Sequence, residues 1–351
     1  MKKLMIAAVA ATMASASQAD ISIKGDAYIQ YADNAIGRTA ASADTTANRK
    51  RVNLNITGKS GATTVVISLR NDDNNNTGAV GGTGASGGTI KTHQFYMTTK
   101  VGPVNVKVGD FYGTIGLGAT SKGASKKDAL VLSTKFGATK VGLYTHDNSN
   151  AAGSTNVFAS TKISGATVKV QHNPNSEAGW TNLMAKGTFG GILVAAEKLS
   201  AKAANSDTTL IHIGGKASGV KWDVAHLKNG TAINDGNAKF APLGSMLVGT
   251  GARGGTSTAV ANSNDFSKIT GLAVSTKVAG NTIKAIFTSL KTASTGASPT
   301  GVLEDTVKGA ELILTRAMSG GKLTVNLGKL SGSTNTDANA TNKGLRFDVK
   351  F

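Results

Sequence analysis

Lysine and arginine side chains are the main candidate functional groups in this sequence. The 351 residues include 38 Lys and Arg against 20 Asp and Glu, so the formal net charge is +18. In 51–59, apolar residues alternate with polar ones, and alternate residues of a strand face opposite sides. The same parity turns Lys24, Arg51, Arg70 and Lys107 toward the hydrophilic face. Such an excess predicts an anionic partner: nucleic acid, a phosphate-rich membrane surface or small anions.

Two short segments match sequence motifs of enzymes, but the strands or helices that normally surround these motifs are not predicted around them. The G-x-S-x-G match at 84–88 lies in a glycine-rich segment with no apolar strand before it. The G-x-G-x-x-G match at 249–254 is followed by no helical period. We therefore predict no catalytic residue, no cofactor and no enzyme activity. The alternative is a barrel hydrolase whose Ser, His and acid converge at the rim, which only proximity after folding would test.

Metal chemistry has little support in the sequence. The five histidines show no metal-ligand spacing, and the absence of cysteine excludes thiolate sites and disulfides. One calcium candidate is the run NDDNNN at 71–76, through Asp72 and Asp73. Runs of this kind are usually solvated loop turns, so we expect no metal.

The C-terminal residues predict a strand between lipid and water. Leu345, Phe347, Val349 and Phe351 share one face of 343–351, and charged residues fall on or near the other. A transmembrane barrel strand has this alternation, with an aromatic residue at the membrane interface. We interpret the four apolar residues as a membrane-insertion signal.

The N-terminus indicates export. Lys2 and Lys3 precede the apolar run 4–14, and small residues at Ser17 and Ala19 suit a signal peptidase. We predict a signal peptide at 1–19 that is cleaved and a single domain at 20–351. No later stretch reaches the roughly 20 apolar residues of a membrane helix, which leaves a closed barrel as the membrane architecture. Export argues against nucleic acid as the partner.

One repeated unit organises the domain: a strand ending in Lys or Arg, a short turn containing Gly, and a second strand. Eight such turns plus the first and last strands predict 18 antiparallel strands, or 16 if hairpins are miscounted. Longer Gly, Asn, Ser and Thr-rich segments join the other strand ends, as extracellular loops do. A soluble sandwich or solenoid is the alternative. The turns lie at 59–61, 100–103, 135–137, 162–165, 186–190, 216–219, 277–280 and 316–320, and the long segments include 32–48, 71–90, 110–128 and 229–265.

Three segments resemble the first, the fourth and fifth, and the last strands of Gram-negative porins: DISIKGDAYIQY, HQFYMTTKVGPVNVKVGD and GLRFDVKF. The resemblance extends in pattern over the mature length. It implies a multi-pass outer-membrane protein, a homotrimer, and a water-filled channel in each subunit narrowed by an inward-folded third extracellular loop.

The third loop departs from the family pattern. Many general porins carry an acidic cluster there, whereas 110–128 has acids only at its ends, Asp110 and Asp128. Between them it offers Lys122, Lys126 and Lys127. With the four basic wall residues, these side chains predict an anion-selective constriction.

Further lysines next to the turns have inward parity, and we expect them to form a basic collar at the periplasmic mouth. They could instead turn outward to lipid headgroups. The expected function is passive diffusion of small hydrophilic solutes such as phosphate, organic acids or acidic amino acids. An adhesin or structural barrel acting through its loops is the alternative, because 229–265 is apolar enough to bind a partner or to fold over the pore. The collar lysines are Lys140, Lys169, Lys221, Lys284 and Lys322.

Overall fold

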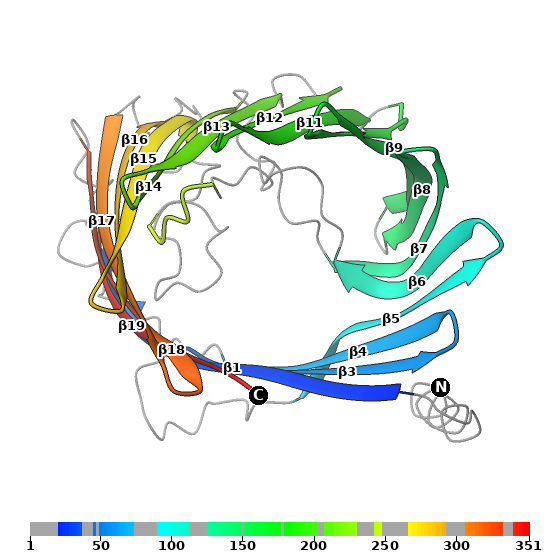
Figure 1. The fold of residues 1–351 in the computed structure, drawn as a ribbon, viewed down its shortest axis with the longest axis horizontal. Helices are drawn as coiled ribbons and strands as arrows, with labels where there is room; N and C mark the ends of the chain where they lie inside the picture. Colours follow the sequence, from blue (N-terminus) through cyan, green and yellow to red (C-terminus); the bar gives the residue numbers. More distant parts are fainter. Residues whose placement is uncertain are drawn as a thin grey trace.

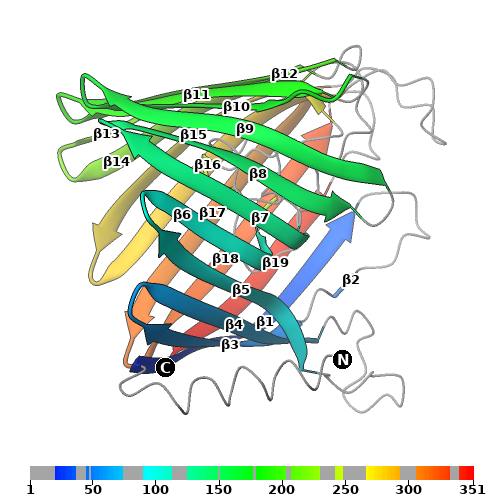
Figure 2. The same ribbon diagram turned by 90° about the vertical axis from the view of Figure 1, so that its right-hand side faces the viewer.

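The protein is a closed barrel of antiparallel strands in a computed structural model. Figure 1 shows the strands as a ring, and Figure 2 shows them inclined to one another around it. Within the described residues no helix is long and apolar enough to cross a bilayer. The structure describes 20–36, 45–46, 49–73, 90–112, 125–148, 151–176, 179–202, 207–229, 242–247, 266–292, 306–332 and 340–351. The predicted signal peptide lies outside these residues.

Strands account for nearly all of the described residues. Their bounds are β1 (Asp20–Ile36), β2 (Thr45–Thr46), β3 (Arg49–Ser60), β4 (Thr63–Asp73), β5 (Lys91–Val101), β6 (Val104–Tyr112), β7 (Ser125–Phe136), β8 (Thr139–Asn148), β9 (Ala151–Ile163), β10 (Ala166–Asn173), β11 (Trp180–Phe189), β12 (Ile192–Ala201), β13 (Thr208–Ala217), β14 (Val220–Asn229), β15 (Phe266–Val278), β16 (Asn281–Thr292), β17 (Thr306–Met318), β18 (Gly321–Gly332) and β19 (Ala340–Lys350).

The barrel closes through β1, which pairs with β3 on one side and with β19 on the other. Each of the other long strands pairs with its neighbours along the chain. β2 is a two-residue strand that only adds to β1. The long strands number 18, which confirms the preferred prediction over 16.

All eight predicted tight turns are present and lie at one end of the barrel, which we call the short-turn end. In the turn between β9 and β10, Ser164 and Gly165 have φ values of 48° and 83°. Positive φ at both central residues is the type I′ geometry, whose twist matches that of paired strands. The sequence signal of Lys or Arg followed by Gly therefore located the hairpins correctly.

The strands extend further toward the opposite, long-loop end than the sequence predicted. β1 runs to Ile36, β4 to Asp73 and β6 to Tyr112, and β7 already begins at Ser125. These predicted strand ends were wrong because we placed them where the residues become polar, whereas β5 begins at Lys91 and β15 at Phe266, directly after the predicted loops 71–90 and 229–265. Backbone ladder bonds do not depend on side-chain polarity, so polar residues mark the end of lipid contact rather than the end of pairing.

The outer face of the barrel is apolar. On β17, outward residues alternate with buried ones, and Leu312 remains 46% exposed. Phe287 on β16 and Leu327 on β18, also outward by register, are 52% and 49% exposed. In a water-soluble protein, large apolar side chains such as these would lie in the core. Here they form a continuous outer surface. This exterior suits lipid, and the soluble alternatives do not explain it.

Phe351 completes the seam between the last strand and the first. Gly25 donates its N–H to the Phe351 carbonyl at 2.7 Å, and the Phe351 N–H returns a bond to the Gly25 carbonyl at 3.0 Å. The phenyl ring lies over Gly25, where a Cβ would come within 2.1 Å of a ring carbon. Glycine at this position is therefore required for the ring to pack against β1.

We expect Gly25→Val to impair barrel closure, because the added side chain occupies the space of the Phe351 ring. Overpacking of this kind costs about 1–3 kcal/mol. The measurement is the fraction of refolded protein that migrates as the compact, heat-modifiable form on an SDS gel. Ala27→Val, on the same outer face of β1, is the matched control and should refold like the native chain. Equal refolding of the two variants would show that the ring contact does not matter.

Candidate functional site

The inner wall is identified by register. Glu311 on β17 contacts the segment 242–247, which lies inside the ring as a short yellow-green trace (Figure 1). Residues paired across strands share a face, so the register carries this inward side around the whole barrel. Basic residues on it far outnumber acidic ones. The basic side chains are Lys24, Arg51, Lys59, Arg70, Lys91, Lys100, Lys107, Lys135, Lys140, Lys162, Lys169, Lys186, Lys216, Lys221, Lys277, Lys284, Lys322, Arg346 and Lys350; the described acidic ones are Asp20, Asp26, Glu197, Asp223, Glu311 and Asp348.

The four wall residues singled out in the sequence lie on this face. Lys24 pairs with Asn55, Arg51 with Tyr28, Arg70 with Asn53 and Lys107 with Thr98. Their strands β1, β3, β4 and β6 are close together in the ring (Figure 1). The wall opposite β15–β17 is therefore strongly basic.

Two arginines share one aromatic ring on the basic wall. The guanidinium carbon of Arg346 lies 3.6 Å from the Tyr28 ring centroid, and that of Arg51 lies 5.4 Å from it. Stacking on a ring fixes the plane of a guanidinium while leaving its N–H groups for other partners. Arg346, which the sequence analysis did not assign to the site, therefore belongs to the basic residues of the inner wall.

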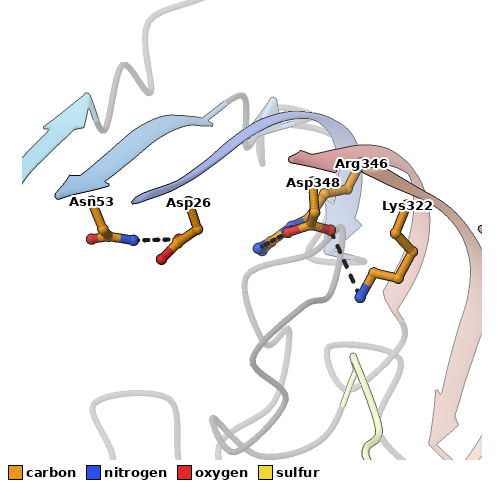
Figure 3. A network of polar contacts seen from close by, with 5 residues as sticks. All are labelled: Asp26, Asn53, Lys322, Arg346 and Asp348. Carbon is orange, nitrogen blue, oxygen red and sulfur yellow. Dashed lines mark hydrogen bonds and ion pairs between the residues drawn. The ribbon is translucent and has the colours of Figure 1, made fainter. Parts of the chain in front are cut away.

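Asp348 balances one of these arginines (Figure 3). Its Oδ1 accepts a bond from Arg346 Nε at 2.8 Å, and its Oδ2 lies 3.9 Å from Lys322 Nζ. On the other side of β1, Asn53 donates to Asp26 at 2.6 Å and accepts from Arg70 Nε at 2.7 Å. These contacts hold the guanidinium groups of Arg346 and Arg70 in fixed positions on the inner face.

Lys107 lies against an aromatic cluster. Its Nζ is 3.9 Å from the centroids of both Tyr96 and Phe111, and Phe111 packs against Tyr144. The rings hold the ammonium group by cation–π attraction without neutralising its charge. The positive charge of Lys107 therefore remains available to the lumen.

The five predicted collar lysines all have inward register, but several are engaged locally. Lys221 forms an ion pair with Asp223 at 3.0 Å, and Lys322 contributes to the Asp348 cluster. Lys140 lies 5.8 Å from the ring centroid of Phe158. Lys284 donates to the Leu243 carbonyl, in the segment that lies inside the barrel. Lys169 pairs in register with Met184 and Ser160. These lysines therefore do not form a continuous collar, because several of them contact neighbouring side chains or the inward segment.

Five of the described inward carboxylates are held by nearby donors. Asp223 receives His212 Nε2 at 3.0 Å in addition to Lys221, and Glu197 accepts from Asn182 at 2.7 Å. Asp26, Glu311 and Asp348 also have the partners described in this section. The negative charge of an engaged carboxylate is partly compensated, so basic side chains dominate the charge of the inner face.

The segment 242–247, from the long connection between β14 and β15, packs on the inner wall. Leu243 and Leu247 are fully buried, and Met246 is nearly so. They join an apolar cluster on the inner faces of β13–β18 that contains Leu210, Ala225, Leu227, Ile269, Ala273, Ile286, Leu290, Val307, Ile313 and Leu330. Our expectation of a wholly hydrophilic lumen face is therefore wrong here, because this segment covers the wall and excludes water from it.

Glu311 anchors the segment with three hydrogen bonds. Its carboxylate accepts the Ser245 hydroxyl, the Met246 N–H at 2.8 Å and the Leu247 N–H at 3.1 Å. Burying these donors without an acceptor would be costly, so the carboxylate makes the inward position of the backbone possible. The sequence signal was a lone acid among apolar neighbours in 309–314, which we did not use.

Two glycines on the wall make room for the leucines of the segment. A Cβ on Gly271 would lie 2.4 Å from Leu243 Cδ1, and a Cβ on Gly328 would lie 2.6 Å from Leu247 Cδ1. Each leucine therefore sits in a depression that only a glycine leaves open. The sequence analysis allowed 229–265 to fold over the pore, and 242–247 does lie inside it.

The predicted lysine cluster of the third loop lies on residues that the structure does not describe fully. Lys122 lies outside the described residues, while Lys126 and Lys127 belong to β7, although their side chains are not described. Asp110 pairs with Phe95 on the outer parity of β6, and its Oδ1 accepts the Asp128 N–H at 3.0 Å. The Asp110 side chain therefore joins β6 to β7 across a bulge instead of facing the lumen.

Among the described residues, no group of three or more potential ligands gathers to hold a metal ion. The calcium candidates Asp72 and Asp73 lie in β4 opposite Arg51 and Lys50, and their side chains are not described. At the seam, Leu345, Phe347, Val349 and Phe351 take the outer face, as parity predicted. Their role as an insertion signal stays a prediction.

Comparison with known proteins identifies the fold. No family model and no curated protein matches the sequence. Among solved structures, a double variant of OccD1 (OprD) aligns with a TM-score of 0.67 and 11% identity over 97% of this chain and 98% of the other. OccAB4 of Acinetobacter baumannii gives 0.66 and 9% over 96% and 99%, and Pseudomonas aeruginosa OpdK with vanillate gives 0.62 and 9% over 95% and 98%. The chain therefore has the barrel fold of the OprD/Occ outer-membrane porins.

We expect Glu311→Gln to loosen the inward segment. Hydrogen bonds to a charged group contribute about 1.5–3 kcal/mol, so the detached population should rise roughly tenfold or more. Single-channel recording should then show larger conductance and more current noise. Glu197→Gln removes the same charge from the inner wall away from the segment and is the control for electrostatics. The same conductance in both variants would mean that the apolar contacts alone hold the segment.

Proposed function

We propose that this chain forms a water-filled, anion-preferring channel in a Gram-negative outer membrane, through which small hydrophilic solutes diffuse passively. The observation that carries the proposal is the charge of the inner wall: Lys24, Arg51, Arg70, Lys107 and Arg346 face inward, while five of the described inward carboxylates are held by donors. The closed barrel, the apolar exterior and the shared fold support a membrane channel.

Anion preference follows from the arrangement of these charges. A unit charge at about 4 Å changes an ion's energy by about 1 kcal/mol in bulk water, and by more beside a low-dielectric wall. Rings or rows of Arg and Lys are the usual device of anion and phosphate pores. The segment 242–247 narrows the lumen from the β15–β18 side, so a solute is brought closer to the basic wall.

Small anions with a carboxylate or phosphate group are the solute class that this wall suits. The guanidinium groups of Arg51 and Arg346, which lie against the Tyr28 ring, have the planar fork shape that matches either group, and Arg346 already binds one carboxylate, that of Asp348. One protein of the same fold was crystallised with vanillate, an aromatic carboxylate. The homotrimer that the resemblance implies is also part of the proposal, with one channel in each subunit.

We expect the triple variant Arg51→Gln, Arg70→Gln and Lys107→Gln to lose anion preference. In a planar bilayer under a potassium chloride gradient, the native protein should reverse toward the chloride equilibrium potential. Loss of about 1 kcal/mol of attraction should reduce the permeability ratio roughly fivefold.

The matched control removes three charges from the outer face through Lys50→Gln, Lys198→Gln and Arg316→Gln. It should keep the native reversal potential, because these side chains do not face the lumen. A cation-selective native channel, or a native protein without conductance, would refute the proposal. Equal loss of selectivity in both triple variants would show that the residues responsible for anion selectivity do not lie on the basic wall.

A further inference from the structure

A row of polar side chains crosses the outer face of β8–β15, and we call it the polar row. It occupies one repeated position in four pairs of neighbouring strands. The first strand of each pair leaves a short turn and contributes its seventh residue, and the second strand contributes a threonine, the ninth residue from its end. The pairs are Thr145–Thr155, His172–Thr181, Lys198–Thr209 and His226–Thr270.

The polar row is an ordered feature of the outer surface. Register turns it outward, because Lys198 follows the inward Glu197. Thr155, Lys198 and Thr270 are exposed. Hydrogen bonds also join members of the row in pairs: the Thr155 hydroxyl donates to Thr145 at 3.3 Å, His172 Nδ1 bonds to the Thr181 hydroxyl at 2.9 Å, and His226 Nδ1 bonds to the Thr270 hydroxyl at 2.8 Å.

The apolar surface ends directly below the polar row, on the side of the short turns. On all eight strands the next outward residue in that direction is apolar. The row therefore marks the upper edge of the apolar surface on this side of the barrel. The eight residues are Leu143, Val157, Val170, Leu183, Ala196, Ile211, Val224 and Leu272.

On the other side of the ring the apolar surface reaches one step further, as can be followed on β16–β18 and on β3 and β4 (Figure 1). The strands that leave short turns there carry Phe287, Leu327 and Leu69 at the seventh position, and the strands that enter them carry Ala310 and Val52 at the ninth position from the end. The change to polar residues comes at the next outward position on each of the five strands. These polar residues are Ser289, Lys329, Asn71, Lys308 and Lys50.

The height of this step follows from strand geometry. At about 3.3 Å per residue and the usual tilt, two residues rise about 5 Å, and the seventh residue lies about 17 Å above the short turn. The apolar band of such barrels is usually about 25 Å tall, and a lysine is tolerated on the lipid face only near its edges. Lys198 therefore places the edge of the hydrocarbon at the polar row.

From this step we infer that the polar row contacts the phosphate and ester groups of the membrane lipids, so that the hydrocarbon along β8–β15 is about 5 Å thinner than along β16–β18 and β3–β4. Hydroxyl, imidazole and ammonium groups can all donate to phosphate and ester oxygens. A membrane adapts to such a step by local thinning or by a tilt of the protein, and either brings its polar layer to the row.

The ammonium group of Lys198 favours a lipid surface over a second subunit as the partner of this face. Lipid phosphate supplies a negative charge, whereas contacts between proteins within a membrane favour small residues. The inference rests on the proposed membrane location of the barrel.

The test measures the depth of single fluorescent labels, which is possible because the chain contains no cysteine. The full barrel is refolded into phosphatidylcholine vesicles with bimane on Thr155→Cys or Thr209→Cys in the polar row. Val52→Cys and Ala310→Cys, at the same strand position on the other side, are the matched controls. Depth is obtained from quenching by lipids that carry a nitroxide on the headgroup or near the end of the acyl chain. The two labels in the row should lie about 5 Å closer to the headgroups than the two controls.

A second variant tests whether the row sets this depth. Adding Lys198→Leu and His226→Leu to Thr209→Cys should move the label at 209 to the depth of the label at 310, because two polar members of the row become apolar. Heat-modifiable migration would show that each variant is folded. An unchanged depth of the label at 209 would overturn the role of the row.

Equal depths on the two sides of the ring would overturn the inference. So would a label at 209 that neither lipid quenches, because a second subunit would then cover this face. Quenching of the labels at 52 and 310 by the acyl-chain nitroxide separates the two proposals. Its absence refutes the membrane location itself, whereas its presence together with equal depths refutes only the step.

Discussion

Closure of the backbone ladder is the constraint on which the rest of this structure depends. A strand in hydrocarbon has no water to satisfy its N–H and C=O groups, so every strand needs two neighbours. β1 meets this need by pairing with both β3 and β19, and the mutual bonds of Gly25 and Phe351 continue the seam. Once the ring is closed, the side chains of each strand have only two directions, outward and inward.

The two directions carry different chemistry, and the division is not uniform around the ring. The outer face is apolar, with lysines near its long-loop end on β14–β18. The inner face is basic on β1–β6, but apolar on β13–β18, where the segment 242–247 covers it. Glu311, Lys284 and two wall glycines hold that segment, so the asymmetry of the lumen comes from one short stretch of loop.

Electrostatics inside the lumen depends on pairing as much as on position. Arg346 and Lys322 share Asp348, and Lys221 shares Asp223 with His212, so these cations are partly compensated. Lys107 lies against two aromatic rings, which hold a cation without cancelling its charge. The effective basic surface is therefore smaller than an inventory of inward lysines suggests, and it is concentrated on β1–β6.

The sequence by itself determined the strand count, the eight turns and the inward parity of residues such as Lys24 and Arg70. These features are local: a two-residue period and a turn containing glycine are readable without knowing what lies across the barrel. Only the tertiary structure decided the strand ends, the outward position of Asp110, the stacking of Arg346 on Tyr28 and the seat of 242–247. Each of these depends on contacts between residues distant in the chain, which neither periodicity nor composition encodes.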